Sequence, residues 1–207
     1  MKNLILSAMV LVSSLAFASA DVGQPAPDFS LKGNDGKTYT LSDATKKKHI
    51  VVLEWFNEGC PYVHKHYDSG NMQRLQKELT DKGDVEWFTI ASSAKGKQGY
   101  LESVAGAAKM RKEKGMNNTA LLLDPGSKVA KDFAAKTTPH MFVIDKKGLV
   151  AYNGAIDSED TARPMKVDDY KKNTSIHKYV EDAVAAVRAE KKPEVASHDP
   201  YGCSIKY

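Results

Sequence analysis

The sequence contains only two cysteines in 207 residues, Cys60 and Cys203. So few cysteines exclude a disulfide-stapled scaffold, although they suffice for one structural or functional bridge. The sequence also has no internal repeat, no low-complexity segment and no long apolar run after residue 20. Its 30 basic residues are scattered among 26 acidic ones. Because a nucleic-acid site gathers basic and aromatic residues together, we expect a solvated surface and no nucleic-acid partner.

Residues 1–20 have the layout of a secretory signal peptide. Lys2 precedes the apolar run Leu4–Ala18, and the small residues ASA stand before Asp21. The apolar run is about 15 residues long, which is short for a membrane span of about 20, and no cysteine follows that could carry a lipid. We therefore predict cleavage after Ala20 and export, to the periplasm or the medium, of a protein without a membrane anchor. Disulfides can form in such an oxidising compartment.

Beyond residue 20, strand and helix patterns alternate along the chain. Apolar runs of strand length alternate with segments whose apolar residues recur at helical spacing, and the last two strands flank a KKG turn as a hairpin. This order predicts an α/β domain in three layers, with a mixed sheet between helices. The predicted strands are 23–31, 36–43, 49–56, 84–92, 119–124, 140–145 and 149–156; the predicted helices are 62–79, 98–114, 125–135 and 176–192, the last capped by Ser175; a polar connection at 157–174 precedes that helix and a tail follows it.

Cys60 lies between a predicted strand and a predicted helix. Pro61 follows it and suits the first turn of a helix. A thiolate at that position faces unpaired backbone N–H groups and the positive end of the helix dipole, which lower its pKa. A free cysteine is more often a buried, inert residue, but this position in an exported protein favours a reactive thiol. His64, one helical turn later, either stabilises the thiolate as an imidazolium or lies at the surface.

Several motifs together resemble one family. They are GQPAPDFSL at 23–31, WFNEGCPYV at 55–63, LLLDPGSKVAKDF at 121–133, TTPHMFVID at 137–145 and the closing helix. They are similar to the redoxin branch of the thioredoxin fold, the alkyl hydroperoxide reductase/thiol-specific antioxidant superfamily with its peroxiredoxin-like and periplasmic thiol–disulfide relatives. The ending YGCSIKY is similar to that of one peroxiredoxin-like group.

The resemblance implies a thioredoxin-like α/β/α sandwich with an N-terminal β-hairpin over residues 21–192, and a C-terminal tail at 193–207. It also implies that Cys60 is the reactive thiol and that Pro139 is a cis-proline facing it. Thr138 would then offer backbone hydrogen bonds to a bound peptide or mixed disulfide. We expect Trp55 and Tyr62 to pack around this site or to contact a substrate peptide.

The sequence also departs from the family. Thioredoxins carry C-x-x-C, but here the run reads C-P-Y-V, and Asn57 stands where many relatives place an earlier cysteine. Peroxiredoxins carry P-x-x-x-T-x-x-C, and the matching positions are Leu53 and Asn57. The arginine of such enzymes aligns roughly with Pro139. We therefore expect weak peroxide reduction, with the Asn57 amide as a remaining donor that tunes the pKa of the thiol.

A nucleophilic cysteine without a neighbouring thiol needs a resolving thiol elsewhere, and Cys203 is the other cysteine in the chain. The 13 residues from Glu190 to Cys203 reach roughly 40 Å when extended. That exceeds the radius of gyration of about 16 Å for a domain of this size. We therefore expect a Cys60–Cys203 disulfide, within one chain or between two. The alternative is that Cys203 is a free thiol in the tail.

Three functions fit this sequence, and the first is preferred. It is a thiol–disulfide oxidoreductase acting on a protein disulfide or dithiol, with Cys203 resolving the mixed disulfide. The second is a peroxiredoxin-like peroxidase, in which Cys60 becomes a sulfenic acid that condenses with Cys203. The third is a copper-binding or chaperone-like module using Cys60, His64 and His140. For the preferred function we expect no cofactor and no metal, and either a monomer or a homodimer.

Overall fold

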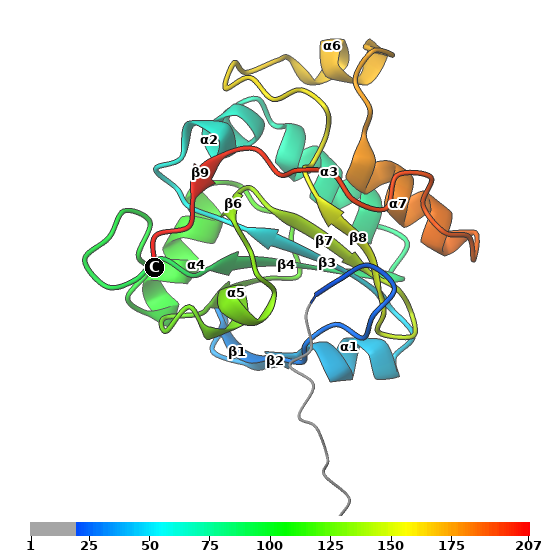
Figure 1. Cartoon of the computed structure of the whole chain (residues 1–207). Helices are drawn as coiled ribbons and strands as arrows, with labels where there is room; N and C mark the ends of the chain where they lie inside the picture. The colour runs from blue at the N-terminus through cyan, green and yellow to red at the C-terminus, as the bar shows by residue number, and fades with distance from the viewer. Residues whose placement is uncertain (1–19) are drawn as a thin grey trace, which may run out of the picture.

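A computed structural model describes residues 20–207 (Figure 1). The predicted signal peptide lies outside the described residues except for Ala20, so it stays a prediction. The strands are β1 (Ser30–Gly33), β2 (Thr38–Thr40), β3 (Ile50–Trp55), β4 (Val85–Ala91), β5 (Ala120–Leu123), β6 (Thr137–Thr138), β7 (Met141–Ile144), β8 (Val150–Gly154) and β9 (Cys203–Ser204). The helices are α1 (Leu41–Lys46), α2 (Pro61–Asp68), α3 (Asn71–Thr80), α4 (Val104–Glu113), α5 (Lys128–Asp132), α6 (Val167–Lys172) and α7 (Tyr179–Arg188).

Seven strands form one mixed sheet in the order β2-β1-β5-β4-β3-β7-β8. Strands β3, β4 and β5 run parallel, whereas β1 and β7 join them antiparallel. Strand β3 lies between β4 and β7, where Leu53 pairs with Phe88 on one side and Phe142 on the other. The predicted mixed sheet and the predicted N-terminal hairpin are therefore confirmed, with β1 and β2 forming that hairpin at one edge.

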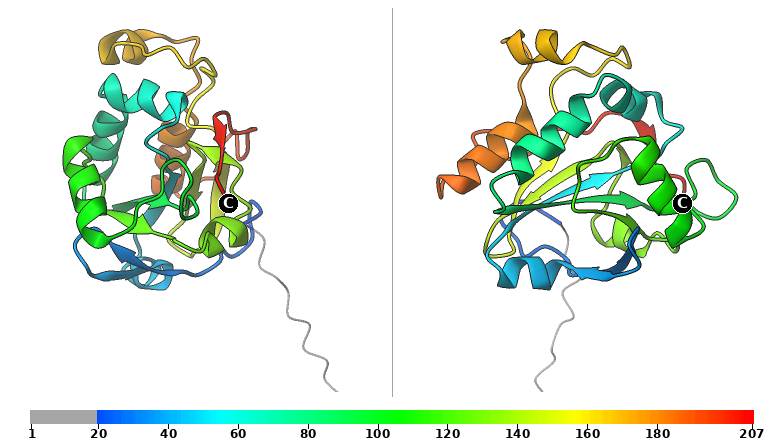
Figure 2. Two further views of the ribbon diagram at one scale, coloured as in Figure 1. Left: turned by 90° about the vertical axis from the view of Figure 1, so that its left-hand side faces the viewer. Right: turned by 180° about the vertical axis from the view of Figure 1, so that it is seen from behind.

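Successive side chains of β3 enter two separate hydrophobic clusters, one on each face of the sheet. Ile50 and Val52 join the cluster covered by α3, α4 and α7, while Val51 and Leu53 join the cluster covered by α1 and α5. All six residues of β3 are buried, as expected of a strand with helices on both sides. Figure 2 shows these two helical layers on either side of the sheet. The chain thus forms the predicted three-layer α/β/α sandwich.

One residue of β3 carries a carboxyl group into this core. Glu54 is fully buried and accepts four hydrogen bonds. The donors are the Tyr67 hydroxyl at 2.9 Å, the Gln76 amide at 3.2 Å, the Trp87 indole at 2.9 Å and the Thr89 hydroxyl at 2.9 Å. Burial raises the pKa of Glu54, although the four donors oppose that effect. The carboxyl therefore ties β3 to α2, α3 and β4 at the centre of the domain.

The long helix predicted over 62–79 is in fact two helices. Gly70 adopts a φ of 79°, a left-handed conformation that glycine tolerates best, and it separates α2 from α3. The predicted helix over 98–114 begins later, at Val104, because the Ser103 side chain accepts a hydrogen bond from the Gly106 N–H and caps it. Both differences arise from local backbone features inside segments with suitable apolar spacing.

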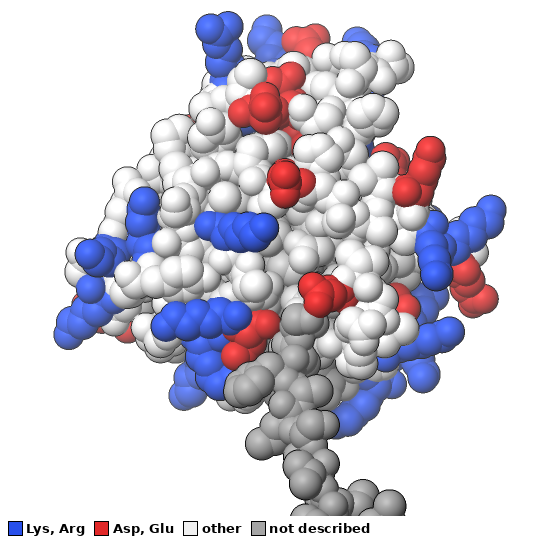
Figure 3. All heavy atoms as spheres, in the orientation of Figure 1, with Lys and Arg blue, Asp and Glu red and all other residues white. Residues whose placement is uncertain are grey.

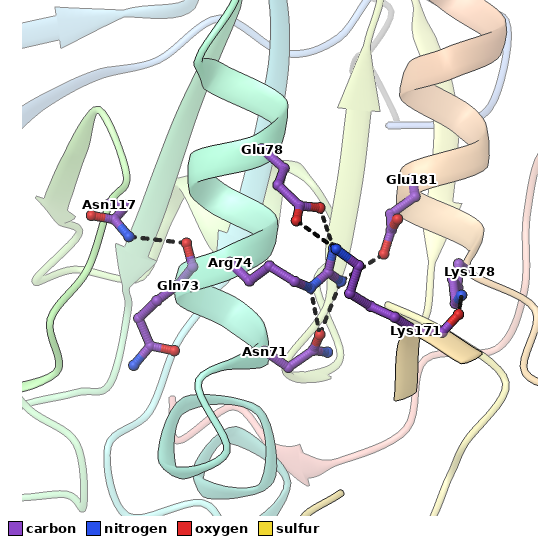
Figure 4. Close-up of polar contacts among 8 residues, drawn as sticks. All are labelled: Asn71, Gln73, Arg74, Glu78, Asn117, Lys171, Lys178 and Glu181. Atoms are coloured by element: carbon purple, nitrogen blue, oxygen red, sulfur yellow. Dashed lines mark hydrogen bonds and ion pairs between the residues drawn. The ribbon is translucent and has the colours of Figure 1, made fainter. Parts of the chain in front are cut away.

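The polar connection at 157–174 contains α6, which lies at one end of the molecule (Figure 1). A charged cluster holds α6 and α7 against α3 (Figure 4). At its centre, Arg74 pairs with Glu78 at 2.5 Å and with Glu181 at 2.8 Å. Lys171 of α6 pairs with the same Glu78 at 3.1 Å. This cluster fixes a segment that has little apolar surface of its own.

The prediction that Ser175 caps the last helix is wrong. The helix begins at Tyr179, with Lys178 as its N-cap residue. The Ser175 hydroxyl instead donates to Asn173 Oδ1 at 2.6 Å, which makes a local turn before the helix. The apolar face that predicted this helix is nevertheless present, because Val180, Val184 and Val187 are all buried.

Charged side chains of both signs are spread over the face of the domain seen in Figure 3. Elsewhere on the surface, exposed pairs such as Lys77 with Asp81 join residues one helical turn apart. Exposed pairs of this kind contribute little to stability, so the fold depends mainly on its two buried clusters. Within residues 20–207, no helix combines the length and apolar character needed to cross a bilayer.

His140, at the entrance to β7, is buried in a neutral form. Its Nδ1 accepts a hydrogen bond from the Lys136 backbone N–H at 3.1 Å, so its Nε2 carries the proton and donates to Asn153 Oδ1 at 2.7 Å. The ring also packs against Phe142, with centroids 4.6 Å apart. Burial lowers the pKa of His140 to about 4, and the Lys136 charge acts in the same direction, although the hydrogen bond to Asn153 opposes both.

This histidine predicts a loss of stability in mild acid. The unfolded chain takes up a proton near pH 6.5, whereas the folded protein does so only near pH 4. The free energy of unfolding should therefore fall as the pH drops from 6.5 towards 4, by up to about 3 kcal/mol for His140 alone. Urea unfolding at several pH values should show a shallower decline for His140→Gln than for the wild type. Equal slopes for the two proteins would contradict this assignment.

Candidate active site

Cys60 lies where β3 passes into α2, as the sequence predicts. It is the N-cap residue of α2, with an extended backbone at φ −86° and ψ 123°. Its carbonyl accepts hydrogen bonds from the N–H groups of Val63 at 3.0 Å and His64 at 2.9 Å. The residue has no exposed surface. The sulfur is therefore held at the start of a helix and shielded from solvent.

A second element meets the cysteine from across the domain. Strand β6 ends at Thr138, and the Cys60 Sγ lies 3.0 Å from the Thr138 carbonyl oxygen. The peptide bond between Thr138 and Pro139 is cis, as the resemblance implied. The Thr138 backbone therefore lies beside Cys60, and its role in binding a peptide or mixed disulfide stays a prediction.

The C-terminal tail brings the second cysteine to the same point. Strand β9 pairs antiparallel with β6, so that Cys203 lies opposite Thr138 and Ser204 lies opposite Thr137. Figure 1 shows the tail running across the domain to this position. The Cys203 thiol lies within hydrogen-bonding reach of Cys60, and both thiols are free. The predicted disulfide between them stays a prediction.

The two thiols hold their protons very differently. Burial opposes ionisation of Cys60, but hydrogen bonds from the Cys203 thiol, the Thr138 side chain and the backbones of Cys203 and Val63 outweigh it and lower its pKa. Burial, together with the hydrogen bond and charge of Cys60, raises the pKa of Cys203 to about 11. The pair therefore keeps its proton on Cys203 and leaves Cys60 as the more readily formed thiolate.

The two aromatic residues flanking Cys60 have different positions. Trp55 is completely buried and packs against Phe133 and Phe142, while its indole N–H donates to Ser92 at 3.2 Å. In this structure Trp55 packs in the core, as one of the two expectations had it, and its contact with a substrate peptide stays a prediction. Tyr62 is half-buried, and its ring lies 5.8 Å from that of Tyr201 in the tail.

Neither residue expected to tune the pKa of Cys60 is directed at its sulfur. His64 Nδ1 lies 2.9 Å from the Asp68 carboxylate on the surface of α2. Asn57 is buried, and its amide N–H donates to the Gln98 carbonyl at 3.2 Å while its Oδ1 accepts from the Gly59 N–H at 2.9 Å. Asn57 therefore orders the loop before Cys60 instead of donating to the thiol.

Sequence reasoning missed the residues that hold the tail in place. His66 is buried, and its Nε2 lies 3.1 Å from the Tyr201 hydroxyl. The same hydroxyl donates to Asp157 at 2.6 Å. Of these residues, only Tyr201 could have been noticed in the sequence, because it lies two positions before Cys203 in the ending YGCSIKY.

The copper alternative lacks a suitable ligand group in the described part of the chain, residues 20–207. His64 bonds to Asp68, and both ring nitrogens of His140 are occupied by Lys136 and Asn153. No group of three or more His, Cys, Asp or Glu side chains within these residues is arranged to hold a metal ion.

Comparisons with known proteins agree with this architecture. A family model described as Redoxin matches residues 21–172. Thioredoxin-like protein YneN from Bacillus subtilis is 28% identical over 148 residues, covering 70% of this chain and 79% of YneN. The crystal structure of an uncharacterized conserved protein from Geobacillus kaustophilus aligns with a TM-score of 0.71 and 23% identity, over 90% of this chain and 92% of the other. Peroxidoxin BcpB from Mycobacterium tuberculosis aligns with a TM-score of 0.52 and 20% identity, over 81% and 96% of the chains.

The fold is the thioredoxin-like fold that thiol–disulfide oxidoreductases share. The chain belongs to the redoxin family, because the family model matches most of its length. The solved structures, at these low identities, establish the common fold alone.

The hydrogen bond from the Cys203 thiol to Cys60 predicts how variants of Cys203 change the pKa of Cys60. Cys203→Ala removes a hydrogen-bond donor from the Cys60 thiolate, whereas Cys203→Ser keeps one in its hydroxyl. The pH midpoint of Cys60 alkylation should therefore be higher in the alanine variant, by roughly one pH unit for one lost hydrogen bond. Iodoacetamide labelling across a pH series measures both midpoints. Identical midpoints in the two variants would argue against this source of the lowered pKa.

Proposed function

We propose that this protein is an exported thiol–disulfide oxidoreductase in which Cys60 is the nucleophile and Cys203 resolves the mixed disulfide. The observation that carries the proposal is the meeting of two thiols of unequal pKa at the Thr138 carbonyl. Because the thiolate is the reactive form of cysteine, Cys60 attacks the substrate first. Cys203 remains protonated until that attack has removed the negative charge from Cys60.

The exchange proceeds in two balanced steps. The Cys60 thiolate bonds to one sulfur of a substrate disulfide, and the other substrate sulfur leaves as a thiolate that takes up a proton. Cys203 then loses its proton and attacks the Cys60 sulfur, which displaces the remaining substrate thiolate. The substrate gains two electrons and leaves as a dithiol, while the protein retains a Cys60–Cys203 disulfide. A partner dithiol restores both thiols by the same exchange in reverse.

Access to Cys60 indicates what kind of substrate fits. Cys60 has no exposed surface while β9 is paired with β6, so the tail must move aside before attack. The freed edge at Thr137 and Thr138 can then pair with an extended segment of a partner protein, as sheet edges commonly do. We infer a protein substrate whose disulfide lies in an extended segment. Because Cys203 meets Cys60 of its own chain, resolution within one chain is favoured over exchange in a homodimer.

Peroxide reduction is the alternative function. Breaking an O–O bond requires donors aimed at the peroxide oxygens, and losing one such donor commonly costs about 10²–10³ in rate. The Asn57 amide is bonded to the Gln98 carbonyl, and Pro139, at the position of the expected arginine, has no side-chain donor. These contacts support ranking disulfide exchange above peroxide reduction.

Rate measurements with the reduced protein test this ranking. A free cysteine with a pKa near 8.5 is only a few per cent thiolate at pH 7, so ionisation alone can raise the rate up to roughly 30-fold. We expect an increase of that size or more with a model disulfide, and no more than that with hydrogen peroxide. Stopped-flow traces of thiol release and of peroxide loss provide the two rate constants.

Two variants serve as controls for these rates. Cys60→Ser should abolish both reactions, whereas Cys203→Ser should keep the attack on the model disulfide and accumulate the mixed disulfide. A peroxide rate constant many orders of magnitude above that of free cysteine, lost in Cys60→Ser, would make the protein a peroxidase.

The resolving role of Cys203 predicts the state of the exported protein. Non-reducing peptide mapping should find Cys60 joined to Cys203 in the mature chain, beginning at Asp21. A bridge closing so long a loop stabilises the folded state by up to about 5 kcal/mol in the chain-entropy model, so reduction should lower the melting temperature. Complete alkylation of both thiols without reductant would remove the bridge from the proposal.

A further inference from the structure

The tail is fixed on both sides of Cys203 by backbone hydrogen bonds and by a tyrosine side chain. After Cys203 it is held by the Ile205 N–H on the Lys136 carbonyl at 3.1 Å, the Ala94 N–H on the Lys206 carbonyl at 2.7 Å and the Tyr207 hydroxyl on the Ala135 carbonyl at 2.7 Å. Before Cys203, the backbone of Ala196 and His198 bonds to that of Asn153 at 3.1 and 3.2 Å. Nearer to Cys203, the Tyr201 side chain is buried among polar groups. Tyr201 is two residues from Cys203, so its position limits where that thiol can lie.

Tyr201 reaches into a buried polar cluster. Its hydroxyl donates to Asp157 Oδ1 at 2.6 Å and accepts from the Nε2–H of His66 at 3.1 Å. His66 is able to donate because its Nδ1 accepts from the Asn71 amide at 3.2 Å. The Lys65 ammonium lies 4.9 Å from the centre of the Tyr201 ring. Burial raises the pKa of Tyr201 well above its ordinary value, so its hydroxyl remains a donor.

Most of these contacts come from the helix that Cys60 begins. Lys65 and His66 belong to α2, and Tyr62, whose ring lies 5.8 Å from that of Tyr201, lies in its first turn. Cys60 is fixed to α2 through the chain, and Cys203 is fixed to the same helix through Tyr201. Both thiols are therefore positioned by the same helix, α2, although 142 residues of sequence separate them.

The residue between Tyr201 and Cys203 allows an unusually close approach. Gly202 has a φ of +136°, and a Cβ atom there would lie 2.1 Å from the Thr138 carbonyl oxygen. That oxygen is the one that accepts from Cys60 Sγ. The tail backbone and the Cys60 thiol thus contact the same carbonyl, which leaves little freedom in the placement of Cys203.

We propose that Tyr201 is a positioning residue that holds Cys203 against Cys60 by anchoring the tail to α2 and Asp157. The inference rests on the proposed function for its purpose, since a resolving thiol is useful only within reach of the nucleophile. The anchor raises the effective concentration of Cys203 at Cys60. It also keeps the tail closed over Cys60 before a substrate arrives.

Tyr201→Phe should therefore change two measurements in opposite directions. The equilibrium constant for forming the Cys60–Cys203 disulfide against glutathione should fall roughly tenfold or more, the change expected for losing a hydrogen bond to a buried carboxyl. In a Cys203→Ser background, the alkaline plateau rate of Cys60 alkylation should rise, because the tail opens more often. If Tyr201 only stabilised the fold, Tyr201→Phe would leave the disulfide equilibrium against glutathione unchanged, provided that the variant and the wild type are both fully folded.

Tyr39→Phe is the matched control. Tyr39 also donates its hydroxyl to a carboxylate, that of Asp35 at 3.0 Å, but on β2 at the far edge of the sheet. Tyr39→Phe should change neither the glutathione equilibrium nor the plateau rate of Cys60 alkylation. Asp157→Asn alters the acceptor of the Tyr201 bond, and its effect should not add to that of Tyr201→Phe, since residues in one hydrogen bond are coupled.

The outcomes separate this inference from the proposed function. An unchanged glutathione equilibrium in Tyr201→Phe, or an equal fall in Tyr39→Phe, overturns the positioning role. If Tyr201→Phe fails to fold, Asp157→Asn carries the same test, and an unchanged equilibrium there overturns it equally. A Cys60 that reacts with a model disulfide no faster than a free thiol defeats the proposed function, while the glutathione equilibrium still measures where Tyr201 places Cys203.

Discussion

The carbonyl oxygen of Thr138 is the point on which the arrangement of the site depends. The Cys60 thiol contacts it from one direction, 3.0 Å away, and the backbone at Gly202 approaches it from another. For this contact to exist, the end of β3 and the end of β6 must be fixed relative to each other. The parallel and antiparallel neighbours of β3, and the buried Glu54 that joins it to α2, α3 and β4, supply that rigidity. The core of the domain thus positions the Cys60 thiol as well as stabilising the fold.

Two cysteines in nearly the same place have pKa values shifted in opposite directions because their donors differ. Burial disfavours both thiolates. Cys60 has a helix N-terminus, the Thr138 side chain and Cys203 itself as donors, and these outweigh burial. Cys203 lies in a two-residue strand without a helix behind it, and its negative neighbour raises its pKa further. In the proposed function, the order of attack therefore follows from secondary structure: Cys60, which begins a helix, attacks the substrate, and Cys203, in the strand, resolves the mixed disulfide.

The sequence allowed the α/β order and the position of Cys60 to be predicted because both depend on local patterns. The apolar run that forms β3 and the proline after Cys60 are contiguous in sequence. The features that were missed depend on partners far apart in the chain. Glu54 is one polar residue in an apolar run, and its donors lie on three other elements. Strand β9 is too short to have a periodicity of its own and exists because β6 pairs with it. The choice between packing and substrate contact for Trp55 depends on which face of the sheet its side chain occupies, and an apolar run does not reveal that face.

In the proposed function, a tail closed over the buried Cys60 creates a conflict between resolution by Cys203 and substrate access to Cys60. Resolution requires Cys203 to return reliably, whereas attack requires it to leave. An apolar anchor would gain about 25 cal/mol for each Å² that it buries and would lose all of this on opening. The Tyr201 anchor is instead made of groups that water can solvate as readily as the protein does, so the net gain from each hydrogen bond is only about 1 kcal/mol. Opening the tail exchanges contacts with Lys65, His66 and Asp157 for contacts with water. A polar anchor of defined geometry can therefore direct Cys203 to one position and still release it when a substrate strand competes for β6.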